Sequence, residues 1–321
     1  MTGPTPPEPA ALPASARTSL ASSHHPNTRG ALFMIAAVVL LSAMDAMMKW
    51  LTAGYSIPQI VFLRSVFSLL PLGLYLAFTV RNPMALYTEH YGTHVLRSLV
   101  GLAALGCLVY AFSRMPLASV VAIAFAAPLF VTLLAVLLLG ERVGIRRWTS
   151  TVVGFLGVLV IVRPGQGDFN QAAWVAVVGT ALYAMVQIFL RQMARTETSA
   201  AIVFYYLMVS LVLTGALMPW LWVMPDGVDW WIFAGTGIVG GLGQICMTNA
   251  FRFGEASVVA PLDYLAILFA TGYGYLLWGE LPDRWVWLGT AIIVGSGLYI
   301  LHRESRLRLP RGLARRLLPR R

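Results

Sequence analysis

Apolar stretches dominate this chain from Gly30 to His302 and limit the folds open to it more than any other feature. About ten such stretches occur, each close to the ~20 residues with which an α-helix crosses the hydrocarbon core of a bilayer. Only 11% of the 321 residues are charged, whereas about 25% are charged in an average soluble domain. The sequence therefore predicts an all-α membrane protein with ten transmembrane helices.

The connections between the apolar stretches are short, so no sizeable soluble domain fits among them. We place the crossings at approximately residues 31–51, 58–79, 94–113, 117–139, 147–162, 172–190, 200–222, 230–251, 257–279 and 285–302. The tails are expected to be a disordered segment at 1–29 and a basic segment at 304–321. Cys107 and Cys246 lie inside apolar stretches, where packing roles are expected rather than a disulfide framework.

Lys and Arg gather on alternate sides of the predicted crossings. One side collects 18 of them, including Arg81, Arg97 and eight arginines near the C-terminus, and the other side has only Arg114, Arg163 and Arg284. Cytoplasmic loops carry the excess of positive charge in membrane proteins, so both termini are predicted to be cytoplasmic. The net charge of +10 is therefore expected to contact anionic lipid headgroups rather than nucleic acid.

The chain repeats itself with an offset of 138 to 142 residues. The run Ala118–Ala122 recurs at 256–260, and the pair Gly140–Glu141 recurs as Gly279–Glu280. Because the order of the matching segments is kept throughout, the chain is predicted to contain two copies of one unit.

Each copy holds five predicted crossings, and this odd number makes the second copy enter the membrane from the opposite side. The predicted architecture is two inverted five-helix repeats, at residues 30–163 and 171–303. Inverted repeats support two similar conformations, each open to one side, with a substrate site near the midplane between the halves. The symmetry favours a transporter over a duplication that serves helix packing alone.

The two repeats, the stretch Ala111–Pro116 that leads into Ala118–Val121, and the Gly-Glu helix ends resemble the EamA domains of the drug/metabolite transporter superfamily. The resemblance implies a ten-helix carrier of the bacterial inner membrane, with a central cavity lined by the first four helices of each repeat and the fifth helix at the periphery. The stretches Met44–Trp50 and Ile60–Arg64 are similar to those of the branch that includes carriers for riboflavin, S-adenosylmethionine and opine metallophores.

Ionisable side chains inside a crossing are costly and normally face the interior of the bundle. Asp45 and Lys49 lie four residues apart on one helix face, where they can pair directly, and Arg64 lies about two turns into the next crossing. We expect Arg64 or Lys49 to bind a carboxylate or phosphate, while Asp45 keeps these cations charged or receives an amine. The alternative is a structural network of the three, in which Lys49 reaches the periplasmic interface.

Asp263 stands alone in the ninth predicted crossing, two residues after Pro261, and the repeat-related stretch around Phe125 is apolar. Pro261 frees backbone carbonyls at this level of the helix. Asp263 is therefore a candidate for proton coupling or for binding a cationic group. The alternative is a structural hydrogen bond to a Tyr or Asn side chain.

Amides and rings in other crossings extend the candidate site, although each is more often a packing residue. Tyr206 aligns with Arg64 in the repeat, which predicts one cationic and one aromatic half of the cavity and hence a ligand with an anionic end and a flat or apolar end. Tyr183 and Tyr205 supply further rings. The residues predicted to bind substrate are Asp45, Arg64, Tyr110, Gln187, Tyr206, Gln244, Asn249, Asp263 and Tyr264.

Other motifs favour structural roles. The glycines between positions 237 and 243 mimic a nucleotide-binding fingerprint, but no strand precedes them, which favours close helix packing. His90 and His94 have the spacing of metal ligands but lack the adjacent Glu of a zinc hydrolase, and the sequence contains no P-loop. We therefore expect no metal, no cofactor and no ATP-driven step within this chain.

These features favour a secondary carrier that moves a small polar metabolite by alternating access, with protons as a candidate coupling ion and membrane lipids as its surroundings. The expected direction is export of an amino-acid-derived solute with a carboxylate, such as an amino acid or an opine-type metallophore. The alternative is import of a heterocyclic metabolite such as riboflavin or S-adenosylmethionine. An intramembrane enzyme is disfavoured because the predicted crossings lack paired acids or a Ser/His arrangement, and a scaffold that acts through its basic tail is a third class.

Overall fold

The computed structural model describes residues 24–80, 86–139, 144–163, 169–193, 196–254 and 256–307. The predicted tail up to residue 23, the Gly140–Glu141 pair and the chain from residue 308 onward lie outside these ranges. Every helix or strand assigned within them is helical, which confirms the predicted all-α fold.

The helices follow the apolar stretches closely. In chain order they are α2 (His24–Leu51), α3 (Ile57–Tyr75) with a π-helical end η1 (Leu76–Val80), α4 (Tyr91–Arg114), α5 (Leu117–Ala124), α6 (Ala127–Leu139), α7 (Ile145–Val162), α8 (Phe169–Met193), α9 (Ser199–Gly215), α10 (Met218–Leu221), α11 (Gly227–Phe253), α12 (Ala256–Val259), η3 (Ala260–Leu265), α13 (Ala266–Trp278) and α14 (Arg284–Leu307). The first helix begins six residues earlier than the predicted start of the membrane unit at residue 30. The predicted crossings at 117–139 and 257–279 are each interrupted.

Six helices in the described ranges are long and apolar enough to cross a membrane. They are Thr28–Leu51, Ile57–Phe78, Tyr91–Arg114, Leu117–Leu137, Gln171–Leu190 and Gly227–Phe253. Two shorter apolar helices cover Trp148–Val162 and Ser199–Gly215. Large apolar side chains such as Phe78 and Leu276 are more than 70% exposed, a costly arrangement in water and a favourable one in lipid. The protein is a multi-pass helical membrane protein.

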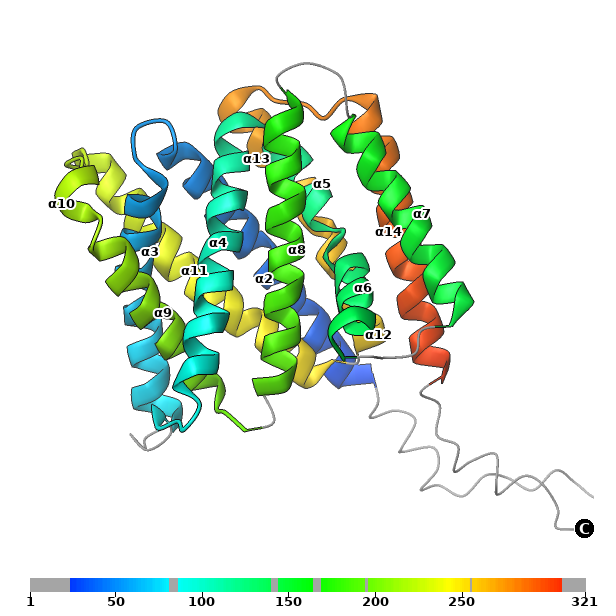
Figure 1. Ribbon diagram of the computed structural model, residues 1–321, viewed down its shortest axis with the longest axis horizontal. Coiled ribbons are helices and arrows are strands. Elements are labelled where there is room, and N and C mark those ends of the chain that lie inside the picture. The colour runs from blue at the N-terminus through cyan, green and yellow to red at the C-terminus, as the bar shows by residue number, and fades with distance from the viewer. Residues whose placement is uncertain are drawn as a thin grey trace, which may run out of the picture.

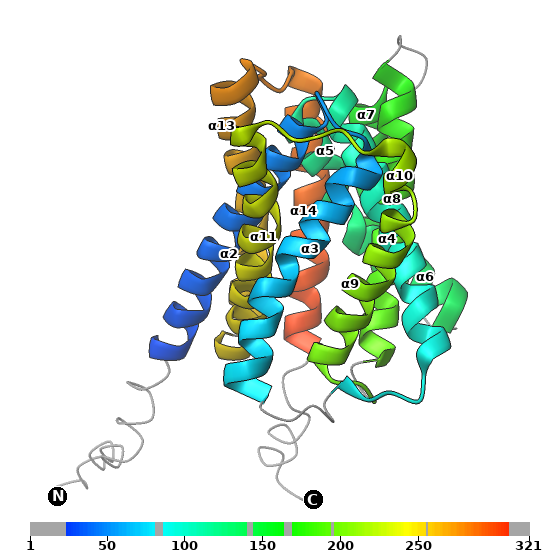
Figure 2. The ribbon, with the colours of Figure 1, turned by 90° about the vertical axis from the view of Figure 1, so that its left-hand side faces the viewer.

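The helices stand side by side in one bundle, and the start of α2 and the end of α14 lie at the same end of it (Figure 2). α2 packs along α11, α8 packs along α4, and α3 contacts both α11 and α9. α7 and α14 pack on each other at one edge of the bundle (Figure 1). This edge position agrees with the peripheral role that the family resemblance implies for the fifth helix of each repeat.

Glycines let α11 approach its two neighbours closely. A Cβ atom on Gly237 would lie 2.5 Å from the Cβ atom of Phe67 on α3, and one on Gly240 would lie 2.5 Å from the sulfur of Met44 on α2. A side chain at position 237 would collide with α3, and one at position 240 would require Met44 to move, so the predicted helix-packing role of this glycine run is confirmed.

Two interruptions meet inside the bundle. The first separates α5 from α6 at Phe125, and the second is the 3₁₀ segment η3, which contains Pro261. Proline has no backbone N–H and cannot continue an α-helical ladder, so the regular helix stops there. The rings of Phe125 and Tyr264 touch edge to face, with centroids 5.1 Å apart. The interruptions thus bring irregular backbone from both halves to one place between the two ends of the bundle.

Candidate functional site

Ionisable side chains from several helices converge on Tyr183 of α8. Tyr183 is 40% exposed, and it interacts electrostatically with Asp263 on η3, Asp45 on α2 and Arg97 on α4. These partners lie on three different elements, so the Tyr183 side chain lies near charged groups from three parts of the bundle. Together with Arg64 on α3, these four residues form the interior polar cluster: Asp45, Arg64, Arg97, Tyr183 and Asp263.

Asp45 and Arg64 lie within electrostatic range of each other, as the sequence predicts. Among the described residues, no hydrogen bond joins their side chains. The Nε and Nη1 atoms of Arg64 are buried without an acceptor, and such an unsatisfied donor costs about 1–3 kcal/mol. The Arg64 guanidinium therefore has free donors that suit an anionic ligand.

Arg97 is a member of this cluster that the sequence did not reveal. Its charge was assigned to the cytoplasmic side, but the residue lies six positions inside α4, and its Nε and Nη1 atoms are buried without an acceptor. Its guanidinium stacks on the ring of Tyr206, 4.6 Å from the centroid. Arg97 lies in the first predicted repeat and Tyr206 in the second, so the division into a cationic and an aromatic half stays a prediction, and one face of the Tyr206 ring is covered by a second cation. The α4 helix starts at Tyr91, about one turn before the start at residue 94 that the apolar stretch predicts, and this places Arg97 further inside the helix than expected.

Asp263 and Tyr264 both lie in the irregular segment η3, but their side chains have different neighbours. Asp263 interacts with Tyr183 and Tyr264 electrostatically, and its carboxylate receives no hydrogen bond from any described side chain. The alternative of a structural hydrogen bond to Tyr or Asn is therefore not observed. The hydroxyl of Tyr264 lies against Gly297 of α14, where a side chain would collide with it. Tyr264 thus reaches the periphery, whereas Asp263 belongs to the cluster.

The remaining predicted residues lie at varying distance from the cluster. Gln187 is exposed and follows Tyr183 by four residues, so both project from one face of α8. Tyr110 is half-buried against the apolar core. Gln244 is exposed and Asn249 half-buried, and none of the hydrogen bonds or ion pairs among the described side chains links either residue to the cluster.

Lys49 takes a different partner from the one that the sequence suggested. Its ammonium donates to both carboxylate oxygens of Glu280, at 2.7 and 2.6 Å, and to the carbonyl of Met115 at 2.9 Å. Glu280 also accepts from the backbone N–H of Leu117 at 3.3 Å, and the ring of Trp278 lies 5.0 Å from the ammonium. The predicted pairing of Lys49 with Asp45 is replaced by a structural clamp that joins the end of α2 to the start of α5 and the segment after α13.

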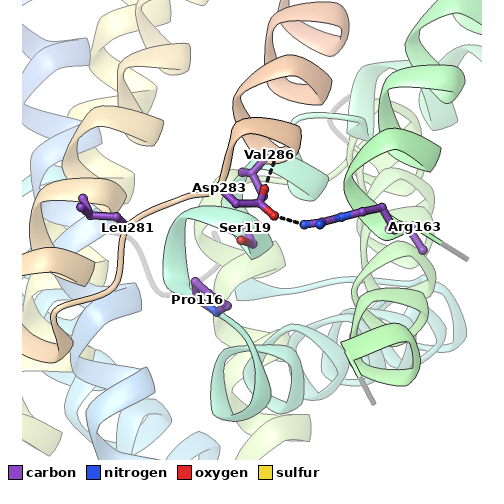
Figure 3. Close-up of a pocket in the computed structure, with 7 residues that line it drawn as sticks. Pro116, Ser119, Arg163, Leu281, Asp283 and Val286 are labelled. Carbon is purple, nitrogen blue, oxygen red and sulfur yellow. Dashed lines mark hydrogen bonds and ion pairs between the residues drawn. The ribbon is translucent and has the colours of Figure 1, made fainter. Parts of the chain in front are cut away.

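A second ion pair lies at the same end of the bundle. Arg163 adopts a left-handed conformation at the C-terminus of α7 and donates to Asp283 (Figure 3). Asp283 caps α14 by accepting from the backbone N–H groups of Trp285 and Val286. Burial raises the pKa of the Asp283 carboxyl, but these hydrogen bonds and Arg163 outweigh it and hold the pKa below its usual value. The pair lines a cavity of about 270 Å³ together with Ser119. Both charged groups in this cavity already have partners.

The opposite end carries an acid held by histidines. Glu197, which precedes α9, accepts from Thr88 at 2.7 Å and lies 3.1 Å from Nδ1 of His90 and 3.4 Å from Nε2 of His94. Burial raises the pKa of the Glu197 carboxyl, yet these hydrogen bonds outweigh burial and lower it. No group of three or more potential metal ligands occurs among the described residues. The contacts tie the start of α4 to the start of α9.

A bundle of membrane-crossing helices that encloses charged side chains has the features of a membrane transport protein. The chain belongs to the EamA-like transporter family, whose model matches residues 28–163 and again residues 170–301. This membership confirms the resemblance that the sequence motifs indicated.

Curated relatives fall in the same branch. The chain is 31% identical over 269 residues to the pseudopaline exporter CntI of Pseudomonas aeruginosa strain UCBPP-PA14, covering 83% of this chain and 93% of the relative. It is 27% identical over 287 residues to a riboflavin transporter of Vibrio cholerae serotype O1, with 88% and 96% covered. It is also 27% identical over 274 residues to an S-adenosylmethionine uptake transporter of Rickettsia felis, with 85% and 92% covered.

A solved crystal structure shares the fold. Its chain is 17% identical and superposes with a TM-score of 0.58, covering 88% of this chain and 99% of the other. At this identity the likeness concerns the fold alone.

Proposed function

We propose that this protein is a secondary transporter of the bacterial inner membrane that exports a small, amino-acid-derived metabolite carrying a carboxylate. The observation that carries the proposal is the interior polar cluster. Charged side chains inside a membrane protein are expensive and mark the path of a solute or an ion. Here they come from both halves of the chain, with Asp45 and Arg64 in the first and Asp263 in the second.

The proposed architecture is ten crossings arranged as two inverted repeats, with both termini in the cytoplasm. The double match to the family model supports two copies of one unit. The helix contacts also support two copies of one unit. In the repeat, α2 corresponds to α8 and α4 to α11, so the contact of α2 with α11 is the counterpart of the contact of α8 with α4. The interruptions at Phe125 and η3 occupy repeat-related positions. Discontinuous helices at the interface of inverted repeats are typical substrate sites of secondary transporters.

The chemistry assigned to the cluster follows from its free groups. Arg64 has unpaired donors that suit a carboxylate, and Asp45 lies within electrostatic range of it. Asp263 lacks a hydrogen-bond donor among the described side chains, so it is available to an amine of the solute or to a coupling proton. Gln187, one turn from Tyr183, supplies an amide that can orient the bound solute.

Export is favoured by the relative with the higher identity, whose name is pseudopaline exporter. The second candidate is import of a heterocyclic metabolite, which the names riboflavin transporter and S-adenosylmethionine uptake transporter favour. The stacking of Arg97 on Tyr206 weighs against this candidate, because it covers one face of a ring that was available for a flat solute.

Metabolite profiling of medium and cytosol tests the function. A deletion strain is compared with strains that express the full-length chain, the Asp263→Asn variant, or the Asp229→Asn variant, whose acid lies outside the cluster and accepts from Tyr55. The expected result is an amino-acid-derived solute that leaves cells with the unaltered chain or Asp229→Asn and is retained at least tenfold more with Asp263→Asn. Accumulation of a solute in the cytosol of cells that express the unaltered chain, relative to the deletion strain, would favour import. Identical profiles in all strains would contradict transport.

A further inference from the structure

We propose that Arg97 binds a second anionic group of the transported solute, so that the substrate class is an amine with two carboxylates at opposite ends. The inference rests on the proposed function and extends it, since that function assigns one carboxylate to Arg64 and leaves Arg97 without a role. The inference starts from a contrast between two buried cations: within the described ranges, Lys49 has a known acidic partner and Arg97 does not.

Arg97 has no acidic partner in the part of the chain that the structure describes. Its electrostatic neighbours are the phenols of Tyr206 and Tyr183 rather than carboxylates. Lys49, by comparison, donates to Glu280 and to a backbone carbonyl. A buried cation without a counter-charge costs several kcal/mol, and this cost falls when an anion binds. Among the described residues no carboxylate fills that place, which leaves it to the solute.

The stacking of Arg97 positions its donors for an anion. The guanidinium lies over the Tyr206 ring with its centre 4.6 Å from the centroid. The N–H groups of a guanidinium lie in its own plane, where two of them match the two oxygens of a carboxylate. The Nε and Nη1 atoms are the pair without acceptors. Tyr206 therefore serves as a platform that orients Arg97.

The two arginines lie at different levels of the interior. Arg64 is seven residues into α3, about 10 Å from the end where that helix begins, and Arg97 is six residues into α4, about 9 Å from the opposite end. The start of α3 and the start of α4 are at opposite ends of the bundle (Figure 1). Tyr183 links the two levels, because it interacts with Asp45 beside Arg64 and with Arg97.

This placement sets the shape of the solute. One carboxylate binds Arg64, the second binds Arg97, and the ammonium group faces Asp263, which neighbours Tyr183. The solute is elongated, with a spacer of several atoms between its anionic groups. A short solute with one carboxylate would leave one of the two guanidinium groups unpaired.

A pair of matched probes tests the second anion site. 2-Aminopimelate and 2-aminoheptanoate share a seven-carbon chain and an amine, and they differ in whether the far end is a carboxylate or a methyl group. We would measure the binding of each to the purified full-length protein by calorimetry, and the counterflow of each in liposomes. The variants are Arg97→Gln, Arg97→Lys, which keeps the charge but loses the fork, and Arg114→Gln, which removes an exposed charge from the same helix.

The unaltered protein and Arg114→Gln are expected to bind 2-aminopimelate at least tenfold more tightly than 2-aminoheptanoate. Arg97→Gln should bring the two dissociation constants within twofold, and Arg97→Lys should give an intermediate ratio, which also covers the case in which the Gln variant does not fold. An unchanged ratio in both Arg97 variants would overturn the proposal. An equal loss of affinity for both probes would also overturn the proposal. That result is expected if Arg64 and Arg97 bind the same single carboxylate at different stages of transport. Counterflow of both probes without a preference would overturn the second anion site and leave transport standing, whereas no counterflow of either would count against both.

Discussion

Single charged residues in this protein fall into two groups that differ in whether they have partners. At the end where α2 meets α13, Lys49 is paired with Glu280 and Arg163 with Asp283. In the interior, the donors of Arg64 and Arg97 are buried without acceptors. Paired charges hold helices together, and unpaired charges are available to a ligand. The distinction indicates a structural role for the charges at the ends and supports the binding role proposed for the charges in the interior.

Breaking the Lys49 clamp is expected to destabilise the protein. Lys49→Met leaves the Glu280 carboxylate without its cation, and Glu280→Gln leaves the 8% exposed ammonium without its acid. Each single variant should lower the unfolding temperature by several degrees, because a buried charge without its partner is strongly destabilising. The double variant should unfold near the temperature of the worse single variant. The measurement is thermal unfolding of the purified protein in detergent, with Arg284→Gln as an exposed control at the same end.

Additive losses in the double variant would show that Lys49 and Glu280 do not act as a pair. A drop in Arg284→Gln of the same size would mean that any loss of charge at this end destabilises the fold.

The sequence predicts Asp45, Arg64 and Asp263 as interior residues because a charge inside an apolar stretch stands out by contrast. The partner of Lys49 could not be found in this way, since Glu280 is 231 residues distant and lies at the end of an apolar stretch, where charges are common. The sequence did not predict Arg97 as an interior residue either, because composition defines the ends of helices less sharply than their middles. What the sequence lacks is the packing that decides which helix ends face each other.

Helices in this bundle are held at close range by glycines, and the same contacts fix the cluster. Gly237 of α11 lies against α3 where a Cβ atom would approach the backbone nitrogen of Ser68 to 2.7 Å and the carbonyl oxygen of Arg64 to 2.8 Å. The position of Arg64 therefore depends on how closely α11 packs on α3. We therefore expect the spacing of these helices to affect the solute binding proposed at Arg64.

Gly237→Ala is expected to destabilise the protein and to weaken solute binding at Arg64. The added methyl group meets backbone atoms that cannot move alone, and overpacking of this kind costs typically 1–3 kcal/mol. Gly272→Ala in α13 is the matched control, because a Cβ atom there has no neighbour within 4 Å and alanine favours the helix by about 1 kcal/mol. Unfolding in denaturant and calorimetric binding of 2-aminopimelate would measure the two effects. Equal behaviour of the two variants would contradict the packing role of Gly237.

The molecule as a whole is organised by contacts that come in exchangeable pairs. α2 on α11 corresponds to α8 on α4, while α3 contacts α9 and α7 contacts α14 as pairs of equivalent helices. These contacts support the proposed inverted repeats, for which two related ways of closing are expected, one at each end. In the described conformation the Lys49 clamp joins helices at one end, and the contacts of Glu197 join α4 to α9 at the other. Polar side-chain contacts therefore join helices at both ends of the bundle, and the interior polar cluster lies between them.

Side-specific labelling tests the proposed orientation of the whole chain. Met224 precedes α11 and is 69% exposed, and Tyr87 precedes α4 and is 61% exposed. The starts of α11 and α4 lie at opposite ends of the bundle (Figure 1). In a background with Cys107→Ala and Cys246→Ala, a membrane-impermeant maleimide should label Met224→Cys in intact cells and Tyr87→Cys only in inverted membrane vesicles. The physical reason is the excess of Arg and Lys on the side of Tyr87, which is retained in the cytoplasm. Labelling of both positions from one side would contradict the alternation of crossings on which the inverted repeats depend, and the reverse pattern would place both termini outside.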